Sequence, residues 1–341
     1  GPAMKSFPGR GLAQRALRAA SCAAARAAAP FRRFDVSVFH QFAPPPDGGG
    51  HQFLRGLVRC LEERGWKVEN NSVSGTTRAC LFNSFNFDAD RLRRLRRPGC
   101  RMVHRLDGPL ATYRGFDDGT DRRTWDLNRE FADATILQSN YSLAQHRALG
   151  FDAANARVIL NAADPAIFHP RGRVPFDPGR KIRLVSTSWS DNRNKGADVY
   201  AWLDEHLDWD RYDYTFIGRL PLRPQHIRVE PPAPSARVAE LLRASDLYVT
   251  ASRNDPCSNS LIEALSCGLP ALCLRSGGHP ELMGAGGETF ETAAEIPELL
   301  EKIAGAYAEY QSRIRPPDLQ DVATAYLDAL GLPAFPPERG A

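Results

Sequence analysis

Short apolar runs alternate along the chain with segments whose apolar residues recur at helical spacing. In the first half, the runs predict strands over residues 34–40, 79–82, 100–105 and 134–138. In the second half, they predict strands over residues 182–187, 214–218 and 246–251. Helices are predicted between them, over residues 53–64, 197–206 and 238–244. Strands that alternate with helices are typical of parallel sheets covered on both faces, so the chain is predicted to form two α/β halves.

A stretch without periodicity separates these halves. Residues 171–180 are rich in Arg, Pro and Gly, which is typical of a linker. We therefore expect an N-terminal domain over residues 34–170 and a C-terminal domain over residues 181–314. Residues 1–33 stand apart, because the opening Gly-Pro-Ala-Met is typical of a remnant of an expression vector and an Ala/Arg-rich, helix-compatible segment follows.

The composition is that of a soluble globular enzyme. A chain of 341 residues is too long for one typical core and fits two domains. No apolar run approaches the ~20 residues that span a bilayer. The seven cysteines are odd in number and lack the spacing of a zinc site. This pattern favours free thiols in a reducing cytosol, so we expect a cytoplasmic protein.

Residues 252–290 carry the clearest indication of chemistry. Asp255 and Glu263 lie eight positions apart across the start of a predicted helix, and Ser258, Asn259 and Ser260 occupy that start. Free backbone N–H groups there suit a diphosphate, and a carboxylate one or two turns further along suits a pair of ribose hydroxyls. A glycine turn follows, with Gly277, Gly278, His279 and Glu281. The combination indicates a nucleotide-sugar pocket, whereas an ordinary helix start with solvated acids does not account for the whole pattern.

This stretch resembles the acidic-x7-Glu signature and the GG-x-x-E segment of family 4 glycosyltransferases, which have the GT-B fold. The resemblance implies two facing Rossmann-like domains with a deep cleft between them. It implies a retaining glycosyltransferase of hexosyltransferase type that uses a nucleotide-sugar donor, with a UDP-sugar favoured and a GDP-sugar as the other option. The implied acceptor is a saccharide, glycolipid or other glycoconjugate in bacterial polysaccharide biosynthesis.

The resemblance also implies roles for single residues. Asp255, where the family usually has Glu, lies near the donor sugar, and Glu263 binds the ribose. Glu281 lies beside the donor, and the backbone amides of the glycine turn bind its hydroxyls or phosphate. Lys195, in a Lys-Gly pair, corresponds to the lysine that neutralises the diphosphate. The arginine usually found five positions earlier is replaced by Ser190, so Arg193 is the candidate substitute; a solvated basic turn is the alternative for both cations.

The first half contains further candidates. Gly49, Gly50 and Gln52 follow the first strand, and the matching loop in the family faces donor phosphates and acceptor, although a tight turn also explains the glycines. His104 and Asp107 stand at the carboxyl end of a strand, the edge that lines the ligand crevice in open α/β sheets. His104 is a candidate catalytic residue, and a packed histidine is the alternative. Asp107 is a candidate for orienting the donor sugar or an acceptor hydroxyl.

Tyr113 and Arg114 begin a loop dense in aromatic, acidic and basic groups. Such a loop suits an acceptor saccharide and equally suits a solvated connection. The proline-broken tail of residues 315–341 contains a helix predicted over residues 319–330, and an amphipathic helix is predicted before it over residues 293–310. In GT-B proteins the last helix often packs back on the first domain, which the resemblance implies here.

Neither a metal nor a cofactor is predicted to be required. The short acidic pairs at residues 88–90 and 117–118 resemble a DxD metal motif, but that motif belongs to enzymes of another fold. Arginines cluster in residues 11–33 and 90–97 and suit an anionic lipid surface at the inner face of a membrane, with a solvated basic helix as the simpler alternative. Nucleic-acid binding is not expected, because no recognition motif accompanies these stretches.

Two other functions stay open, because a fold alone does not establish an activity. One is a degenerate GT-B protein that binds a sugar or a partner without transferase activity. The other is a different GT-B enzyme, such as a sugar-nucleotide epimerase or a phosphorylase, although phosphorylases of this fold are generally much larger. The sequence does not determine the oligomeric state.

Overall fold

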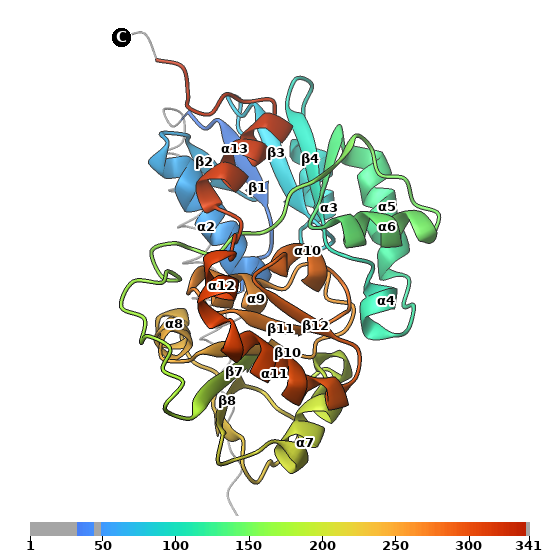
Figure 1. The fold of residues 1–341 in the computed structure, drawn as a ribbon. Helices are drawn as coiled ribbons and strands as arrows, with labels where there is room; N and C mark the ends of the chain where they lie inside the picture. The colour runs from blue at the N-terminus through green and yellow to red at the C-terminus, as the bar shows by residue number, and fades with distance from the viewer. Residues whose placement is uncertain (1–32, 44–48, 339–341) are drawn as a thin grey trace, which may run out of the picture.

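The computed structural model describes residues 33–43 and 49–338, which form two parallel six-stranded sheets with helices on both faces (Figure 1). The opening Gly-Pro-Ala-Met, nearly all of the Ala/Arg-rich segment and residues 44–48 of the glycine loop lie outside the described residues. Each sheet belongs to one domain, and the two domains lie end to end. The predicted α/β class with two Rossmann-like units is confirmed.

The first sheet has the strand order β2-β1-β3-β4-β5-β6, and all neighbouring strands are parallel. Its strands are β1 (Val36–Phe39), β2 (Val68–Asn70), β3 (Ala79–Asn83), β4 (Arg101–Leu106), β5 (Ala134–Leu137) and β6 (Ala156–Val158). Its helices are α2 (Gly49–Glu63), α3 (Ala89–Leu95), α4 (Leu110–Arg114), α5 (Thr120–Phe131) and α6 (Asn140–Ala148). The central strands are buried on both faces, as is typical of a parallel sheet.

The second sheet has the order β12-β11-β10-β7-β8-β9 and is also parallel throughout. Its strands are β7 (Ile182–Ser188), β8 (Tyr212–Gly218), β9 (Arg228–Glu230), β10 (Leu247–Thr250), β11 (Ala271–Leu274) and β12 (Gly287–Phe290). Its helices are η2 (Arg193–Lys195), α7 (Ala197–His206), α8 (Ser235–Arg243), α9 (Asn259–Ser266), α10 (His279–Met283), η3 (Ala293–Glu295), α11 (Ile296–Gly305) and α12 (Tyr307–Ser312). No helix within the described residues is long and apolar enough to cross a membrane.

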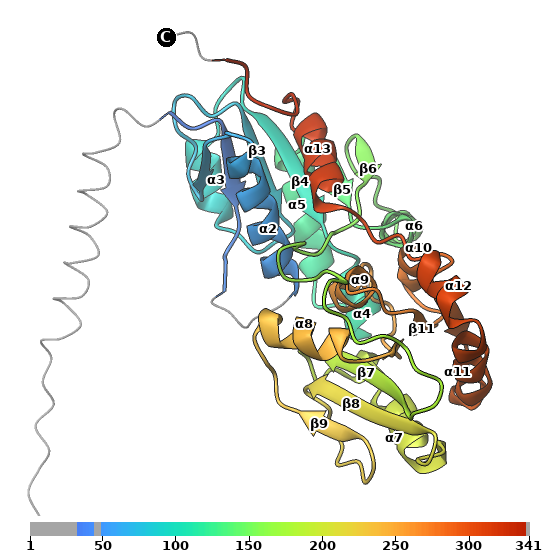
Figure 2. The same ribbon diagram turned by 60° about the vertical axis from the view of Figure 1, so that its left-hand side comes forward.

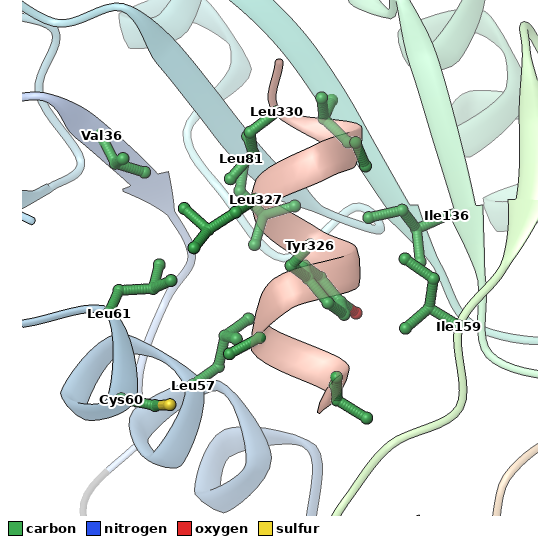
Figure 3. Packing of buried hydrophobic residues seen from close by; sticks show 14 of the residues in the cluster. Val36, Leu57, Cys60, Leu61, Leu81, Ile136, Ile159, Tyr326, Leu327 and Leu330 are labelled. Carbon is green, nitrogen blue, oxygen red and sulfur yellow. The ribbon is translucent and has the colours of Figure 1, made fainter. Parts of the chain in front are cut away.

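The last helix, α13 (Leu319–Ala329), crosses from the second domain and packs on the first sheet (Figure 2). Its side chains Tyr326 and Leu327 are fully buried and join the cluster formed by α2 and the strands β1, β3, β4 and β5 (Figure 3). Leu57, Leu61 and Leu81 lie in the same cluster. Burying a leucine of this kind stabilises the fold by about 1.5–3 kcal/mol, so the first domain depends on the end of the chain for one wall of its core.

The structure corrects two helix predictions. The single helix predicted over residues 293–310 is wrong, because the chain forms η3, α11 and α12 there and breaks at Ala306, whose ψ is 32°. Helix α2 begins at Gly49, four residues before its predicted start. The three-residue strands β2, β6 and β9 were not predicted, since so short a segment shows no hydrophobic periodicity.

Candidate active site

Residues that follow the carboxyl ends of β4, β5 and β10 line a cavity of about 250 Å³ between the domains. The first domain contributes Asp107, Tyr113 and Gln138, together with Gly50 at the start of α2. The second domain contributes Asp255 and Asn259. Ligands bind at the carboxyl ends of strands in open α/β sheets, so this cavity is the candidate active site.

Lys195 and Asp255 form an ion pair beside this cavity. Lys195 Nζ lies 3.2 Å from Asp255 Oδ2, 3.4 Å from Ser252 Oγ and 5.6 Å from the centroid of the Tyr113 ring. Gly196, which has a φ of +80°, brings the lysine there, because a Cβ at this position would lie 2.4 Å from the Ala251 carbonyl oxygen. The glycine of the Lys-Gly pair therefore allows the end of η2 to lie close to the end of β10.

The two charges stabilise each other. Burial alone opposes the charged form of Asp255, but the positive charge of Lys195 outweighs it and lowers the pKa of the Asp255 carboxyl. Burial likewise opposes the charge of Lys195, and Asp255 outweighs it and raises the pKa of the ammonium group. A full positive charge is thus held where a diphosphate is expected.

Helix α9 begins next to this pair. Ser258 caps it, since its Oγ accepts a hydrogen bond from Leu261 N at 3.3 Å. Asn259 and Ser260 form the first turn. Glu263 lies one turn further and is 8% exposed. No group in residues 33–43 or 49–338 donates a hydrogen bond to its carboxyl, and burial raises its pKa to about 8.

Glu263 faces a narrow crevice between α9 and α2, which also contains Gln52 and Gly49. Gln52 closes the crevice from the other domain by accepting a hydrogen bond from Ser235 Oγ at 2.9 Å. Gly49 packs directly on Asn259, whose Cβ and Nδ2 would lie 2.7 Å from a Cβ at residue 49. Glycine is therefore required at this domain contact, while a Cβ on Gly50 would meet open space.

The glycine turn supports Asp255. A Cβ on Gly277, which has a φ of +60°, would lie 2.2 Å from Asp255 O, and one on Gly278 would lie 2.4 Å from Pro256 O. The amides of Gly278 and His279 donate to Asp255 O and Ser276 O. In this conformation protein oxygens already occupy the amides of Gly278 and His279, whereas binding of the donor by the Gly277 amide stays a prediction.

His279 and Glu281 also make contacts within the protein. The His279 ring is fully buried; its Nδ1 lies 3.0 Å from Leu274 O, and its Nε2 has no partner in the described part of the chain. Burial lowers the pKa of His279. Glu281 accepts hydrogen bonds across the domain boundary from Asn140 N, at 2.9 Å, and from Asn140 Nδ2, at 3.0 Å. It thereby joins α10 to the start of α6, and it does not line the cavity.

His104 lies in the core and does not reach the cavity. It is fully buried on β4, stacked at 4.2 Å on the Phe82 ring, with Nε2 at 2.8 Å from Ser84 O and Nδ1 at 3.2 Å from Asn128 Nδ2. Burial lowers its pKa to about 3, so the ring is neutral. Successive strand residues point to opposite faces, and sequence position alone did not show which face His104 occupies. The alternative of a packed histidine is the one observed.

Arg114 and Arg193 line a different, larger cavity of about 1060 Å³ on the other side of Tyr113 and Lys195. Arg114 pairs with Asp118 at 2.9 Å. The exposed Arg193 side chain has no hydrogen-bond or ion-pair partner among the residues that the structure describes. The expected substitution of the missing arginine by Arg193 therefore has no geometric support at the Lys195–Asp255 pair.

The arginines of residues 90–97 mostly bond to the protein itself. Arg93 makes a bidentate pair with Glu130, with Nε at 2.6 Å from Oε1 and Nη2 at 2.7 Å from Oε2. Arg91 and Arg97 donate to the backbone oxygens of Asn71 and Thr77. These contacts weaken the case for this run as a lipid-binding surface.

Arg105 is the main polar residue that the sequence analysis missed. It is 1% exposed and donates to Asn83 Oδ1 at 2.7 Å, Asn161 Oδ1 at 2.8 Å and the Tyr326 hydroxyl at 3.0 Å. The available signal was a charged residue inside an apolar strand, since such residues are almost never fully buried without partners. Its partners lie far apart in the sequence and were not predictable.

No three His, Cys, Asp or Glu side chains within the described ranges come together as metal ligands. The six described cysteines are all buried free thiols.

Comparisons with known proteins agree with this architecture. Residues 214–309 match the family described as glycosyl transferases group 1. Sucrose-phosphate synthase from Thermosynechococcus elongatus has a similar structure, with a TM-score of 0.64 at 15% identity over 88% of this chain and 96% of that chain. Curated protein sequences include no significant match.

Two ligand-bound structures are also similar. Anabaena HepE in complex with UDP-glucose has a TM-score of 0.61 at 15% identity over 88% of this chain and 100% of that chain. The catalytic domain of Arabidopsis thaliana starch synthase IV, bound to ADP and acarbose, has a TM-score of 0.65 at 12% identity over 88% of this chain and 99% of that chain. These comparisons confirm the predicted resemblance to GT-B glycosyltransferases and show that the chain has the GT-B fold.

Proposed function

We propose that this protein is a retaining, metal-independent glycosyltransferase of hexosyltransferase type. It transfers a sugar from a nucleotide-sugar, a UDP-sugar in the first instance and a GDP-sugar otherwise, to a saccharide, glycolipid or other glycoconjugate in bacterial polysaccharide biosynthesis. The observation that carries the proposal is the juxtaposition of the partly buried Lys195–Asp255 pair with the start of α9 and the unpartnered Glu263. UDP-glucose in the HepE structure supports the choice of UDP.

The departing diphosphate is the group that needs stabilisation. Lys195 supplies a positive charge, and the free N–H groups at the start of α9 supply dipoles directed at the same place. Both are present before the reaction, so neither needs to reorganise as the sugar–phosphate bond breaks. Glu263 accepts hydrogen bonds from the ribose hydroxyls, which fixes the nucleotide one helical turn away.

Asp255 has two roles in the proposal. It holds the Lys195 ammonium group in place, and it approaches the donor sugar as an acceptor of its hydroxyls. Asp107 faces it from the first domain and orients the acceptor hydroxyl. In a same-face reaction the leaving phosphate takes the acceptor proton, so no separate strong base is needed. The surfaces of the two domains that line the cavity together exclude water and limit hydrolysis of the donor.

Calorimetry tests the donor site first. UDP, GDP and a panel of their sugar conjugates are titrated into the protein with EDTA present. Saturable binding of one conjugate supports the metal-free pocket and identifies the donor for transfer assays with saccharide and lipid-linked acceptors. No binding across the panel contradicts the proposal.

The products then distinguish the alternatives. Donor-dependent formation of a glycosylated acceptor with the same anomeric configuration supports a retaining transferase. Conversion of the nucleotide-sugar without an acceptor into an epimer indicates an epimerase. Binding without any turnover indicates a degenerate sugar-binding protein. If the acceptor is lipid-linked, the protein is expected to bind the inner face of a membrane. Co-sedimentation of the protein with anionic vesicles tests this binding.

A further inference from the structure

Four side chains of the first domain form a closed ring of hydrogen bonds beside the cavity. Arg105 Nη1 donates to Asp107 Oδ1 at 3.4 Å, and Arg105 Nη2 donates to Asn161 Oδ1 at 2.8 Å. Asn161 Nδ2 donates to Gln138 Oε1 at 3.2 Å. Gln138 Nε2 closes the ring by donating to the same Asp107 oxygen. Three of the four side chains are at least 97% buried, and only Asp107 reaches the cavity with a substantial part of its surface.

The direction of every bond in this ring is set by its charged members. A guanidinium group only donates and an ionised carboxylate only accepts. Asn161 must therefore present its oxygen to Arg105 and its nitrogen to Gln138. Gln138 must then present its oxygen to Asn161 and its nitrogen to Asp107. The two amide orientations, which are otherwise ambiguous, have a single consistent solution.

Arg105 itself cannot turn away from this arrangement. It also donates to Asn83 Oδ1 and the Tyr326 hydroxyl, and its guanidinium carbon lies 5.0 Å from the centroid of the Phe53 ring. Burial opposes its charge, but Tyr326 and Asp107 outweigh that effect and raise its pKa. Arg105 therefore stays positively charged, and the donor–acceptor direction of the hydrogen bonds in the ring stays fixed.

The ring continues into the second domain. Asn161 Nδ2 also donates to Asn259 Oδ1, at 3.1 Å. Because the Asn259 oxygen is used in this way, its amide nitrogen must point elsewhere. It faces Gly49, at the start of α2, where a Cβ would lie 2.7 Å from it. Gly49 and Asn259 both line the narrow crevice that Glu263 faces, so the hydrogen-bond donor is presented to that crevice, which shares Asn259 with the cavity.

We propose that Arg105 and Asn161 are positioning residues that set the polarity of the cleft. Through them, the cleft presents an acceptor, the Asp107 carboxylate, in the cavity and a donor, the Asn259 amide nitrogen, in the narrow crevice that shares Asn259 with the cavity. The donor lies in the first turn of α9 and suits an oxygen of the nucleotide-sugar diphosphate. Because the Asn161–Asn259 bond crosses the domain boundary, this polarity is complete only when the domains are closed. The inference rests on the proposed function.

The test is Asn161→Asp, with Asn155→Asp as the matched control. The introduced carboxylate keeps a strong bond to Arg105, but it donates to neither Gln138 nor Asn259. The Asn259 amide must then turn its nitrogen toward the carboxylate and its oxygen toward the ligand. Asn155 also donates a side-chain hydrogen bond, to Asp133 O at 2.7 Å, away from the cavity. Calorimetry compares the affinities of both variants for UDP and for uridine, or for the corresponding base if the wild type prefers another nucleotide.

We expect Asn161→Asp to weaken diphosphate binding roughly ten-fold, on the scale of one hydrogen bond to a charged group. Binding of the nucleoside should change less than two-fold, because it lacks the phosphate oxygens. The control should bind both ligands as the wild type does. Equal losses for nucleotide and nucleoside, or no loss at all, would overturn the inference.

Failure of the proposed function is a separate result. If the wild type binds no nucleotide on the panel, crystal structures of the wild type and Asn161→Asp still test the ring. The inference requires the Asn259 side chain to turn and the Gln138–Asp107 bond to lengthen or break in the variant. An unchanged arrangement of these three side chains would overturn it without any ligand.

Discussion

The two walls of the cleft are built in different ways. In the second domain, the groups proposed to bind the donor come from one short part of the chain around α9 and from the Lys195 turn, and they make few bonds to the rest of the protein. Glu263 has no hydrogen-bond partner within the described ranges, and Lys195 contacts Asp255, Ser252 and the Tyr113 ring. In the first domain, Asp107 is one end of a buried network in which Arg105 donates to four side chains.

This difference separates two ways of making a site. A helix start supplies N–H groups and charge locally, so a sequence motif is enough to recognise it. A network of buried polar groups needs partners from several strands and from α13, so it exists only after folding. Substitutions in the second domain should therefore act mainly on ligand binding and catalysis, and those in the first domain should act on stability as well.

Lys195→Ala should have the largest effect. Removing the positive charge beside the diphosphate should lower kcat/KM by about 10²–10³-fold, the range found when one preorganised stabilising group is deleted. Initial transfer rates measure it, and thermal unfolding checks that the protein remains folded. Lys302→Ala is the control, since Lys302 pairs with Glu288 on the surface, away from the cleft. A loss below three-fold would remove Lys195 from the catalytic site.

Glu263→Gln should abolish a pH dependence of stability. Burial raises the pKa of Glu263 to about 8 in the folded protein, above its ordinary value in the unfolded chain. The folded state therefore holds a proton that the unfolded state releases, and the free energy of unfolding falls as pH rises from about 4.5 to about 8. The loss should be of the order of a few kcal/mol.

Urea titrations from pH 5 to pH 9 measure this effect, with Glu309→Gln as the control because Glu309 is an exposed residue paired with Arg313. The Glu263→Gln variant should show a flatter profile than the wild type over that interval. Parallel profiles for the two proteins would mean that Glu263 is ionised in the folded state, and its assignment as an unpartnered carboxyl would then be wrong.

Tyr326→Phe should cost about 1–3 kcal/mol of unfolding free energy, because it leaves the Nε of the buried Arg105 without an acceptor. Urea denaturation measures the change. Tyr310→Phe removes a hydroxyl that bonds to the partly exposed Glu288 and should cost less. If both variants lose the same unfolding free energy, the hydrogen bond between Tyr326 of α13 and Arg105 stabilises the protein no more than a partly exposed bond does.

Glu281→Ala should have the smallest effect and should act on domain closure. It removes the acceptor of the Asn140 bonds, worth about 1 kcal/mol on the scale of a helix cap. The open population should rise about five-fold, which small-angle X-ray scattering detects as a larger radius of gyration. Glu291→Ala, which breaks a surface pair with Arg275, is the control. A weaker donor affinity with unchanged dimensions would instead support Glu281 as a donor ligand.

The sequence by itself determined the α/β class, the two-domain division into sheets and the helix start that carries Ser258 and Glu263. These follow from apolar runs, capping residues and spacing, which are local properties. Asp255 and Lys195 were candidates because each lies in a short motif that resembles a family signature, and a motif of this kind is also a local property.

Only the tertiary structure decided which polar side chains reach the cavity. His104 and Arg105 are neighbours on one strand, yet His104 stacks in the core and Arg105 bonds to Asn161 and Tyr326, 56 and 221 positions away. It also showed that Glu281 joins the domains and that Arg193 faces another cavity. The physical reason is that a buried polar group is placed by its hydrogen-bond partners, and those partners are brought together by the packing of distant elements rather than by the local pattern.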